Sequence, residues 1–210
     1  MSKKKHKKPA PKAKSSAPAA KHPPLQILAQ KLEAQNYEAS FIPQGEDDEV
    51  PFDNLVVILD ELDEQPEDSA NVLEPELLLQ IFFVEDMMKA HEPDLPADET
   101  PDFSTLQFIL ELPTDWDELA DERLEEGLLL LNAFSQRMPV GHFTLEEGAL
   151  IYTYSLLAEN QRINSTVILA ALDLMRFFIA PMNAIFEAFA SDNLSLEAAL
   201  DQLDERISAA

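Results

Sequence analysis

The chain has 210 residues, of which 46% are hydrophobic, and it carries a formal net charge of −25 and no cysteine. This length and hydrophobic fraction are those of one globular domain with its own core. The absence of cysteine excludes disulfides, thiolate catalysis and cysteine-based metal clusters. It agrees with a reducing cytoplasm, which is the localisation we expect.

The charge is divided unevenly along the chain. Residues 1–24 contain eight lysines and no acidic residue, which gives this segment a charge of +8. Of the 15 basic residues, 7 remain for residues 25–210 against all 40 acidic ones, so this body carries −33. Such a body repels nucleic acid and anionic membranes, and only the basic segment is suited to bind either.

The basic segment, residues 1–24, is rich in Lys, Pro and Ala, and we expect it to be disordered because it has too little apolar surface to offset the entropy of ordering. One interpretation is an electrostatic tether to RNA, ribosomes, anionic lipid or an acidic partner; the other is an inert, solubilising extension. Lysine runs without aromatic residues provide no stacking platform, which favours the inert extension. The candidate electrostatic contacts are Lys3, Lys4, Lys5, Lys7, Lys8, Lys12, Lys14 and Lys21.

Residues 25–210 are expected to form a single domain that begins with one helix and three strands. Apolar residues at helical spacing predict a helix over residues 25–35, with Pro23 and Pro24 at its start. Residues 85–103 read as an acidic loop or a short helix, and Pro113 is expected to end the third strand. The predicted strands are residues 54–59, 77–84 and 106–112, with a weaker signal at 40–42.

A helix and a β-hairpin are predicted next. Thr114 is suited to cap a helix that extends to about Gln136. Residues 140–145 and 150–157 then alternate in polarity on either side of Glu146-Glu147-Gly148. This pattern predicts a hairpin in which Gly148 takes a positive φ.

The chain ends with a long apolar helix and a shorter amphipathic one. The long helix extends to Ala190, and the residues suited to cap it are Asn164, Ser165 and Thr166. Pro181 predicts a kink or a division into two helices. The last helix begins near Asn193 or Ser195.

The element order is therefore helix, three strands, helix, two strands, helix and an extra C-terminal helix. The strands follow one another without crossover helices, which is typical of antiparallel pairing. We predict an α+β domain in which helices pack on an antiparallel sheet of about five strands.

This order resembles the fold shared by the YbjN family of bacterial proteins and the class I type III secretion chaperones. The likeness is strongest over residues 128–190, in the helix end LLNAFSQRMP, the hairpin GHFTLEEGALIYTYSLL and the long helix that follows. The resemblance implies a small cytoplasmic protein without catalysis that is often a homodimer. Such a protein binds an extended segment of another protein or acts as a regulator. The basic segment and the long acidic loops depart from the chaperones and favour the YbjN side.

The sequence contains no recognisable catalytic, cofactor or metal motif. The four histidines have no paired spacing, and the four glycines form no phosphate-binding loop. The acidic run at residues 46–49 lacks the register of a Ca²⁺ loop, so we interpret it as solvated charge. We predict no enzyme activity, no cofactor and no metal site, and we expect His142 to be a structural or exposed strand residue.

Several remaining residues are assigned structural roles. Gly127 is expected to permit close helix packing. Arg137, Arg162 and Arg176 are expected to pair with neighbouring acidic residues; the alternative is a composite anion site, if folding brings them together. Trp116 is expected in the core or an interface. The phenylalanines expected in the core, rather than in a cofactor site, are Phe177, Phe178, Phe186 and Phe189.

Two functional hypotheses have specific support, whereas a third class, an enzyme built from surface carboxylates, has only generic support. The leading one is a non-enzymatic protein-binding or regulatory module that uses a sheet edge or an apolar groove. The alternative is a nucleic-acid or ribosome-associated accessory protein that docks through residues 1–24. We expect no membrane-spanning segment, because uninterrupted apolar runs such as residues 81–84 and 128–131 fall far short of the roughly 20 residues a span needs.

Overall fold

The computed structural model describes residues 22–45, 50–59, 77–92, 102–117 and 119–208. The eight lysines of the basic segment lie outside these residues, so its disorder and its partners stay predictions. In chain order the elements are α1 (Pro24–Glu33), β1 (Ala39–Ile42), β2 (Asn54–Ile58), β3 (Leu78–Phe83), α2 (Val84–His91), β4 (Phe103–Asp115), α3 (Asp121–Arg137), β5 (His142–Glu146), β6 (Ala149–Glu159), α4 (Ser165–Ala190) and α5 (Leu196–Ser208).

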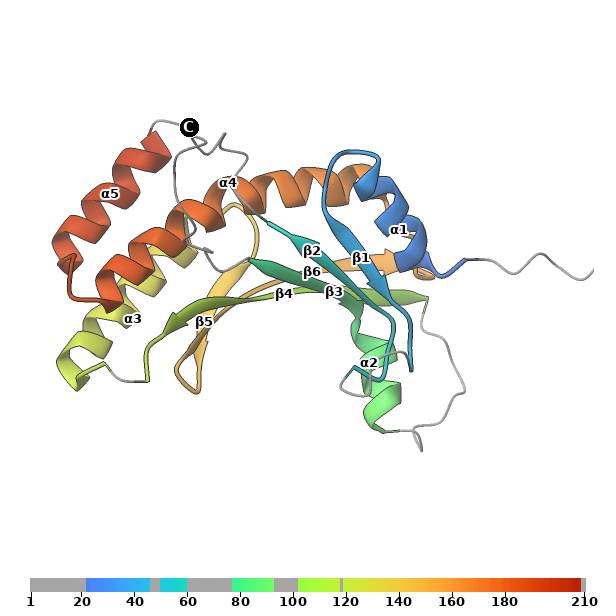
Figure 1. Cartoon of the computed structure of the whole chain (residues 1–210), viewed down its shortest axis with the longest axis horizontal. Helices are drawn as coiled ribbons and strands as arrows, with labels where there is room; N and C mark the ends of the chain where they lie inside the picture. The colour runs from blue at the N-terminus through green and yellow to red at the C-terminus, as the bar shows by residue number, and fades with distance from the viewer. Residues whose placement is uncertain (1–21, 46–49, 60–76, 93–101, 118, 209–210) are drawn as a thin grey trace, which may run out of the picture.

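The strands form a six-stranded sheet in the order β1-β2-β3-β4-β6-β5, and every neighbouring pair is antiparallel. Four helices (α1, α3, α4 and α5) lie on one side of the sheet, and the short α2 lies on the other (Figure 1). This confirms the predicted α+β class. The sheet has one strand more than expected, because the weakly patterned residues 40–42 form most of the edge strand β1.

The core lies between the sheet and α4. Alternate residues of each central strand turn toward the helices, as the period of two requires. Each of these large side chains contributes roughly 1.5–3 kcal/mol by leaving water. Fully buried residues from the sheet include Leu55, Leu79, Ile81, Phe108, Leu110 and Tyr152, and those from α4 include Leu172, Met175, Ile179, Phe186 and Phe189.

The helix α4 is a single element of 26 residues that continues through Pro181, so the predicted division into two helices is wrong. Asn164 caps it, and its side chain accepts a hydrogen bond from the backbone N–H of Thr166 at 3.1 Å. By length and composition α4 is apolar enough to cross a membrane. In the fold it lies across the sheet and buries one side there, as core helices do. The expectation of no spanning segment stays a prediction.

Two predicted boundaries between β4 and α3 are wrong. β4 does not end at Pro113 but continues to Asp115, because a register shift between Glu111 and Asp115 accommodates the residue that cannot donate to the ladder. Thr114 is therefore a strand residue and not a helix cap. α3 begins at Asp121, and the residue before it makes no side-chain cap.

The hairpin prediction is confirmed. β5 and β6 pair from His142 opposite Thr153 to Glu146 opposite Ala149. At the turn, Glu147 has φ 50° and Gly148 has φ 82°. Two successive positive φ angles are those of the tight turns that match the twist of hairpin strands.

The connection between α1 and α4 fixes how α4 is rotated on the sheet. Tyr37 follows α1 in the chain, and its hydroxyl donates a hydrogen bond to the Asp173 carboxylate of α4. The Arg176 guanidinium, also from α4, lies 4.6 Å from the centre of the Tyr37 ring. Burial, followed by this hydrogen bond, raises the pKa of the Tyr37 phenol. The Lys31 ammonium group of α1 also donates a hydrogen bond to the Ser165 hydroxyl of α4 at 3.2 Å. One side of α4 is thereby held against α1.

Trp116 and Gly127 form a close contact beneath α3. A Cβ atom added at Gly127 would lie 2.6 Å from the Trp116 ring, and Trp116 itself is 1% exposed. The ring is held by Phe186 and Phe189, at centroid distances of 5.8 and 6.0 Å. The predictions that Trp116 is a core residue and that Gly127 permits close packing are both confirmed.

We predict that Gly127→Ala lowers the free energy of unfolding. Alanine improves helix propensity by up to about 1 kcal/mol, but forcing a methyl group against a fixed ring costs roughly 1–3 kcal/mol. The expected net loss is about 1 kcal/mol in urea unfolding, followed by Trp116 fluorescence. Asn132→Ala, at an exposed position of the same helix, is the control and is expected to change stability by less than about 0.5 kcal/mol. A Gly127→Ala protein as stable as this control would contradict the packing argument.

Candidate protein-binding edge

The strand β6 is twice as long as the strand that covers its outer side. β4 pairs with β6 along nearly its whole length, from Phe103 opposite Glu159 to Asp115 opposite Ala149. β5 pairs only with residues 149–153. Among the described residues, no strand lies along the outer side of residues 154–159. Figure 1 shows β5 ending partway along β6.

The backbone groups on this outer side can be assigned from one hydrogen bond. The Asn160 N–H donates to the Asp102 carbonyl at 2.9 Å, which marks these two opposite residues as a hydrogen-bonded pair. In an antiparallel ladder, hydrogen-bonded and non-hydrogen-bonded pairs alternate. The residues whose N–H and C=O turn toward β4 are therefore Tyr154, Leu156 and Ala158, and those whose groups turn outward are Ser155 and Leu157.

The other side of β4 supports this assignment. Thr105, which is opposite Leu157, must turn its N–H away from β6. It does so, and both carboxylate oxygens of Glu85 accept that N–H, at 2.8 and 3.0 Å. Glu85 of α2 thus takes the place of a β3 partner for β4 at the point where β3 has ended. Across the described residues, nothing equivalent is found for the outward groups of Ser155 and Leu157.

This open edge lacks the features that protect the other two. β1 is only four residues long and is followed by Pro43, and β5 carries the exposed His142 and Glu146. Residues 154–158, with the sequence YSLLA, contain no charge and no proline, and Leu157 is 76% exposed. Folded proteins usually blunt an open edge with charge, proline or a bulge. An unprotected edge of this kind is suited to pair with another strand.

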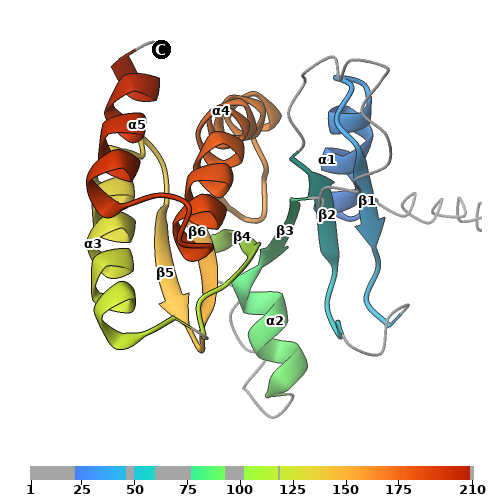
Figure 2. The same ribbon diagram turned by 60° about the vertical axis from the view of Figure 1, so that its left-hand side comes forward.

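The side of α4 above this edge is apolar. Because Ser165, Asp173 and Arg176 face α1, helical geometry turns the opposite side of α4 away from α1. The sheet order puts β6 on that side of β4, and Figure 2 shows α4 between α1 and the β5–β6 hairpin. The side chains on this side of α4 are Val167 (45% exposed), Leu174 (38% exposed) and the half-buried Phe178.

We name the combined feature the β6–α4 surface, defined as Tyr154 and Leu156 of β6 with Val167, Leu174 and Phe178 of α4; the side chain of Leu157 lies on the opposite face of the sheet. Tyr154 and Leu156 are half-buried and pack against the core. Phe177, beside this surface, is 52% exposed, so the prediction that it belongs to the core is wrong. The helical spacing of apolar residues in the sequence predicts which of them share a side of α4. It does not predict which of those sides the rest of the fold covers.

The end of β6 is acidic. Asp102 and Glu159 are both exposed there, with the 57% exposed Phe103 opposite Glu159. Beneath them, Gln161 donates to the Asp86 carboxylate of α2 at 3.0 Å. Burial raises the pKa of Asp86, and the hydrogen bond from Gln161 opposes that shift. Arg162 is an exposed cation at the same end.

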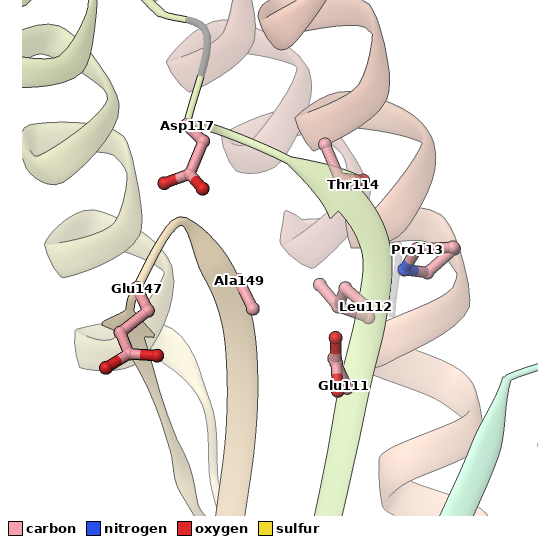
Figure 3. A pocket seen from close by; sticks show the side chains of 7 residues that line it. All are labelled: Glu111, Leu112, Pro113, Thr114, Asp117, Glu147 and Ala149. Atoms are coloured by element: carbon pink, nitrogen blue, oxygen red, sulfur yellow. The ribbon is translucent and has the colours of Figure 1, made fainter.

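A separate pocket of about 380 Å³ lies where β4 bulges beside the hairpin turn. Figure 3 shows Asp117 pointing toward this turn and Glu147 lying on its outer side. A Cβ added at Gly148 would lie 2.0 Å from the Asp117 carboxylate, so Asp117 packs tightly on the turn. No group of three His, Asp or Glu side chains suited to a metal occurs among the described residues. The pocket identifies no reaction and no ligand.

The predicted roles of the other residues have mixed outcomes. His142 is an exposed strand residue, as expected. Arg137 pairs with Asp204 at 2.9 Å, as expected, whereas Arg176 stacks on Tyr37. Arg162 makes no ion pair with the described residues.

Arg123 was missed by the sequence analysis, because nothing local in α3 distinguishes it. Its guanidinium lies 3.5 Å from the centre of the Phe189 ring and donates to the Phe189 carbonyl at 2.7 Å and to the Leu194 carbonyl. It satisfies carbonyl groups at and beyond the end of α4, and so ties α3 to the turn before α5.

Comparison of the chain with protein-family models and with curated proteins gives no match. The resemblance to the YbjN family and the type III secretion chaperones therefore stays a prediction, as does the homodimer it implies.

The assignment of outward groups predicts losses of stability of very different size for two neighbouring prolines. Ser155→Pro removes an N–H that faces solvent, so we expect it to lower the free energy of unfolding by about 1 kcal/mol or less. Leu156→Pro removes an N–H that pairs with β4 and is expected to cost about 3 kcal/mol or more. Urea unfolding of both variants measures the difference. Equal losses would show that the outward assignment is wrong.

Proposed function

We propose that this protein is a non-enzymatic protein-binding or regulatory module that holds an extended segment of a partner along the outer side of β6. The observation that supports it most directly is the unprotected, unpaired edge formed by residues 154–158. Its length is near that of an average strand in a globular protein.

Pairing along this edge supplies affinity through the backbone. The N–H and C=O groups of Ser155 and Leu157 offer four hydrogen-bonding positions to an added strand, which is the recognition mode of β-augmentation. Each bond contributes a net 0.5–1.5 kcal/mol in typical cases.

The β6–α4 surface supplies selectivity. Side chains of an added strand alternate between two sides. Those directed toward the helices would meet Tyr154, Leu156 and the apolar side of α4, and those directed away would lie beside Ser155 and Leu157. Apolar residues at alternate positions of the partner are therefore favoured.

The proposal predicts that Ser155→Pro abolishes peptide binding while Ser155→Ala preserves it. Peptides would be selected on the immobilised full-length protein from a library of extended sequences, and their affinities measured by fluorescence anisotropy. Proline removes the outward N–H and obstructs the added strand, so we expect a loss of at least about tenfold, equivalent to 1.4 kcal/mol. Alanine loses the same Ser155 hydroxyl, which bonds to Gln107, but keeps the backbone donor; its affinity should stay within about twofold.

Hydrogen exchange gives a second measurement that does not depend on a variant. Bound peptide should slow exchange of the Ser155 and Leu157 amides and leave that of Gln136, on exposed α3, unchanged. Selected peptides that bind Ser155→Pro and Ser155→Ala equally, and that leave the two amides unprotected, would rule out this edge as the binding site.

A further inference from the structure

The charge of the protein indicates which charge a segment bound along β6 should carry. Residues 25–210 carry a net charge of −33. A field of this size raises the association rate of positively charged partners and lowers that of negatively charged ones. A second copy of this body would carry the same −33, so pairing of β6 with another β6 works against strong repulsion.

The local charges act in the same direction at one end of the edge. Glu159, the last residue of β6, and Asp102 are both exposed, and Glu85 and Asp86 of α2 are half-buried on the adjacent side of β4. The described cations nearby are Arg162, Lys89 and Lys31, which donates to the Ser165 hydroxyl just beyond β6; Lys89 lies 3.8 Å from Asp86. Four carboxylates against three cations leave this end net acidic.

The rest of the edge is uncharged. Residues 154–158 and the α4 side chains Val167, Leu174 and Phe178 carry no ionisable acid or base other than the Tyr154 phenol, whose pKa is raised by burial. The apolar residues of the chain's own basic segment, residues 1–24, are Met1, alanines and prolines, so this segment would satisfy the acidic end and leave the apolar part poorly covered.

We propose that the partner of β6 is a net-basic extended segment of another protein, with apolar residues at alternate positions and Lys or Arg at the end that meets Glu159. This inference rests on the proposed function. A strand added antiparallel to β6, as in the rest of the sheet, begins beside Glu159 and ends near His142. Its basic residues are therefore N-terminal to its apolar ones.

Four synthetic peptides test this chemistry on the full-length protein. Each contains a seven-residue core. In three peptides apolar and polar residues alternate in the core: the first carries three lysines before it, the second three lysines after it, and the third three glutamates before it. The fourth carries three lysines before a core of the same residues in scrambled order. Affinities are measured at low and high salt on the wild type and on Ser155→Pro, Ser155→Ala, Glu159→Gln and Glu147→Gln. Glu147, an exposed acid of the hairpin turn, is the matched control.

We expect the peptide with lysines first to bind most tightly, by about tenfold over the glutamate peptide at low salt, with the difference shrinking as salt screens the charges. Only Ser155→Pro should abolish its binding. Glu159→Gln should weaken it about two- to fivefold, which is the range of one exposed charge pair, and Glu147→Gln should not.

The outcomes separate the two proposals. If all alternating peptides bind equally and Ser155→Pro still abolishes binding, the edge is correct and the basic partner is wrong. If the lysine peptides bind Ser155→Pro as well as Ser155→Ala, they adhere to the acidic surface generally, and the basic partner along β6 is again wrong. If no peptide shows a Ser155-dependent affinity while the protein sediments as a dimer that Ser155→Pro dissociates, a second copy occupies the edge and both proposals fall.

Discussion

The pairing of β4 with β6 is the interaction on which the rest of the fold depends. These strands have 13 and 11 residues and pair from Phe103 opposite Glu159 to Asp115 opposite Ala149. β3 attaches to the outer side of β4, and β5 attaches to the outer side of β6. Because β5 has only five residues, the same long ladder that holds the sheet together leaves half of β6 without a neighbouring strand among the described residues. The candidate site is thus a consequence of unequal strand lengths.

The helix α4 divides its circumference among three environments. One side packs on the sheet through residues such as Leu172 and Met175. A second is fixed to α1 through Asp173 and Arg176, which sets the rotation of the helix. The third is apolar yet exposed, and this rotation places it on the β6 side of the sheet. A surface suited to binding therefore arises from ordinary core packing, without any motif dedicated to it.

Local chemistry predicted much of the architecture, and long-range contacts account for most of the errors. Gly148 predicts the hairpin turn, and the three cap candidates at residues 164–166 predict the start of α4, because both signals depend on a few adjacent residues. Thr114 favours a helix start because a threonine hydroxyl can accept a hydrogen bond from the backbone of a first helical turn. That preference was overridden by a β4 ladder that continues through the bulge around Pro113. Phe177 was assigned to the core because periodicity gives the spacing of apolar residues and not which of them are covered.

The sequence by itself determined the α+β class, the acidic body and its uncharged segment YSLLA, since composition, charge and alternation are properties of the chain. Only the tertiary structure decided that this segment is an open edge, because strand order and the relative lengths of β5 and β6 depend on contacts distant in sequence. It also decided that Ser155 and Leu157 turn outward, since this follows from the register with β4. The apolar side of α4 lies beside that edge because Tyr37, which is distant in sequence, contacts α4 and sets the rotation of the helix.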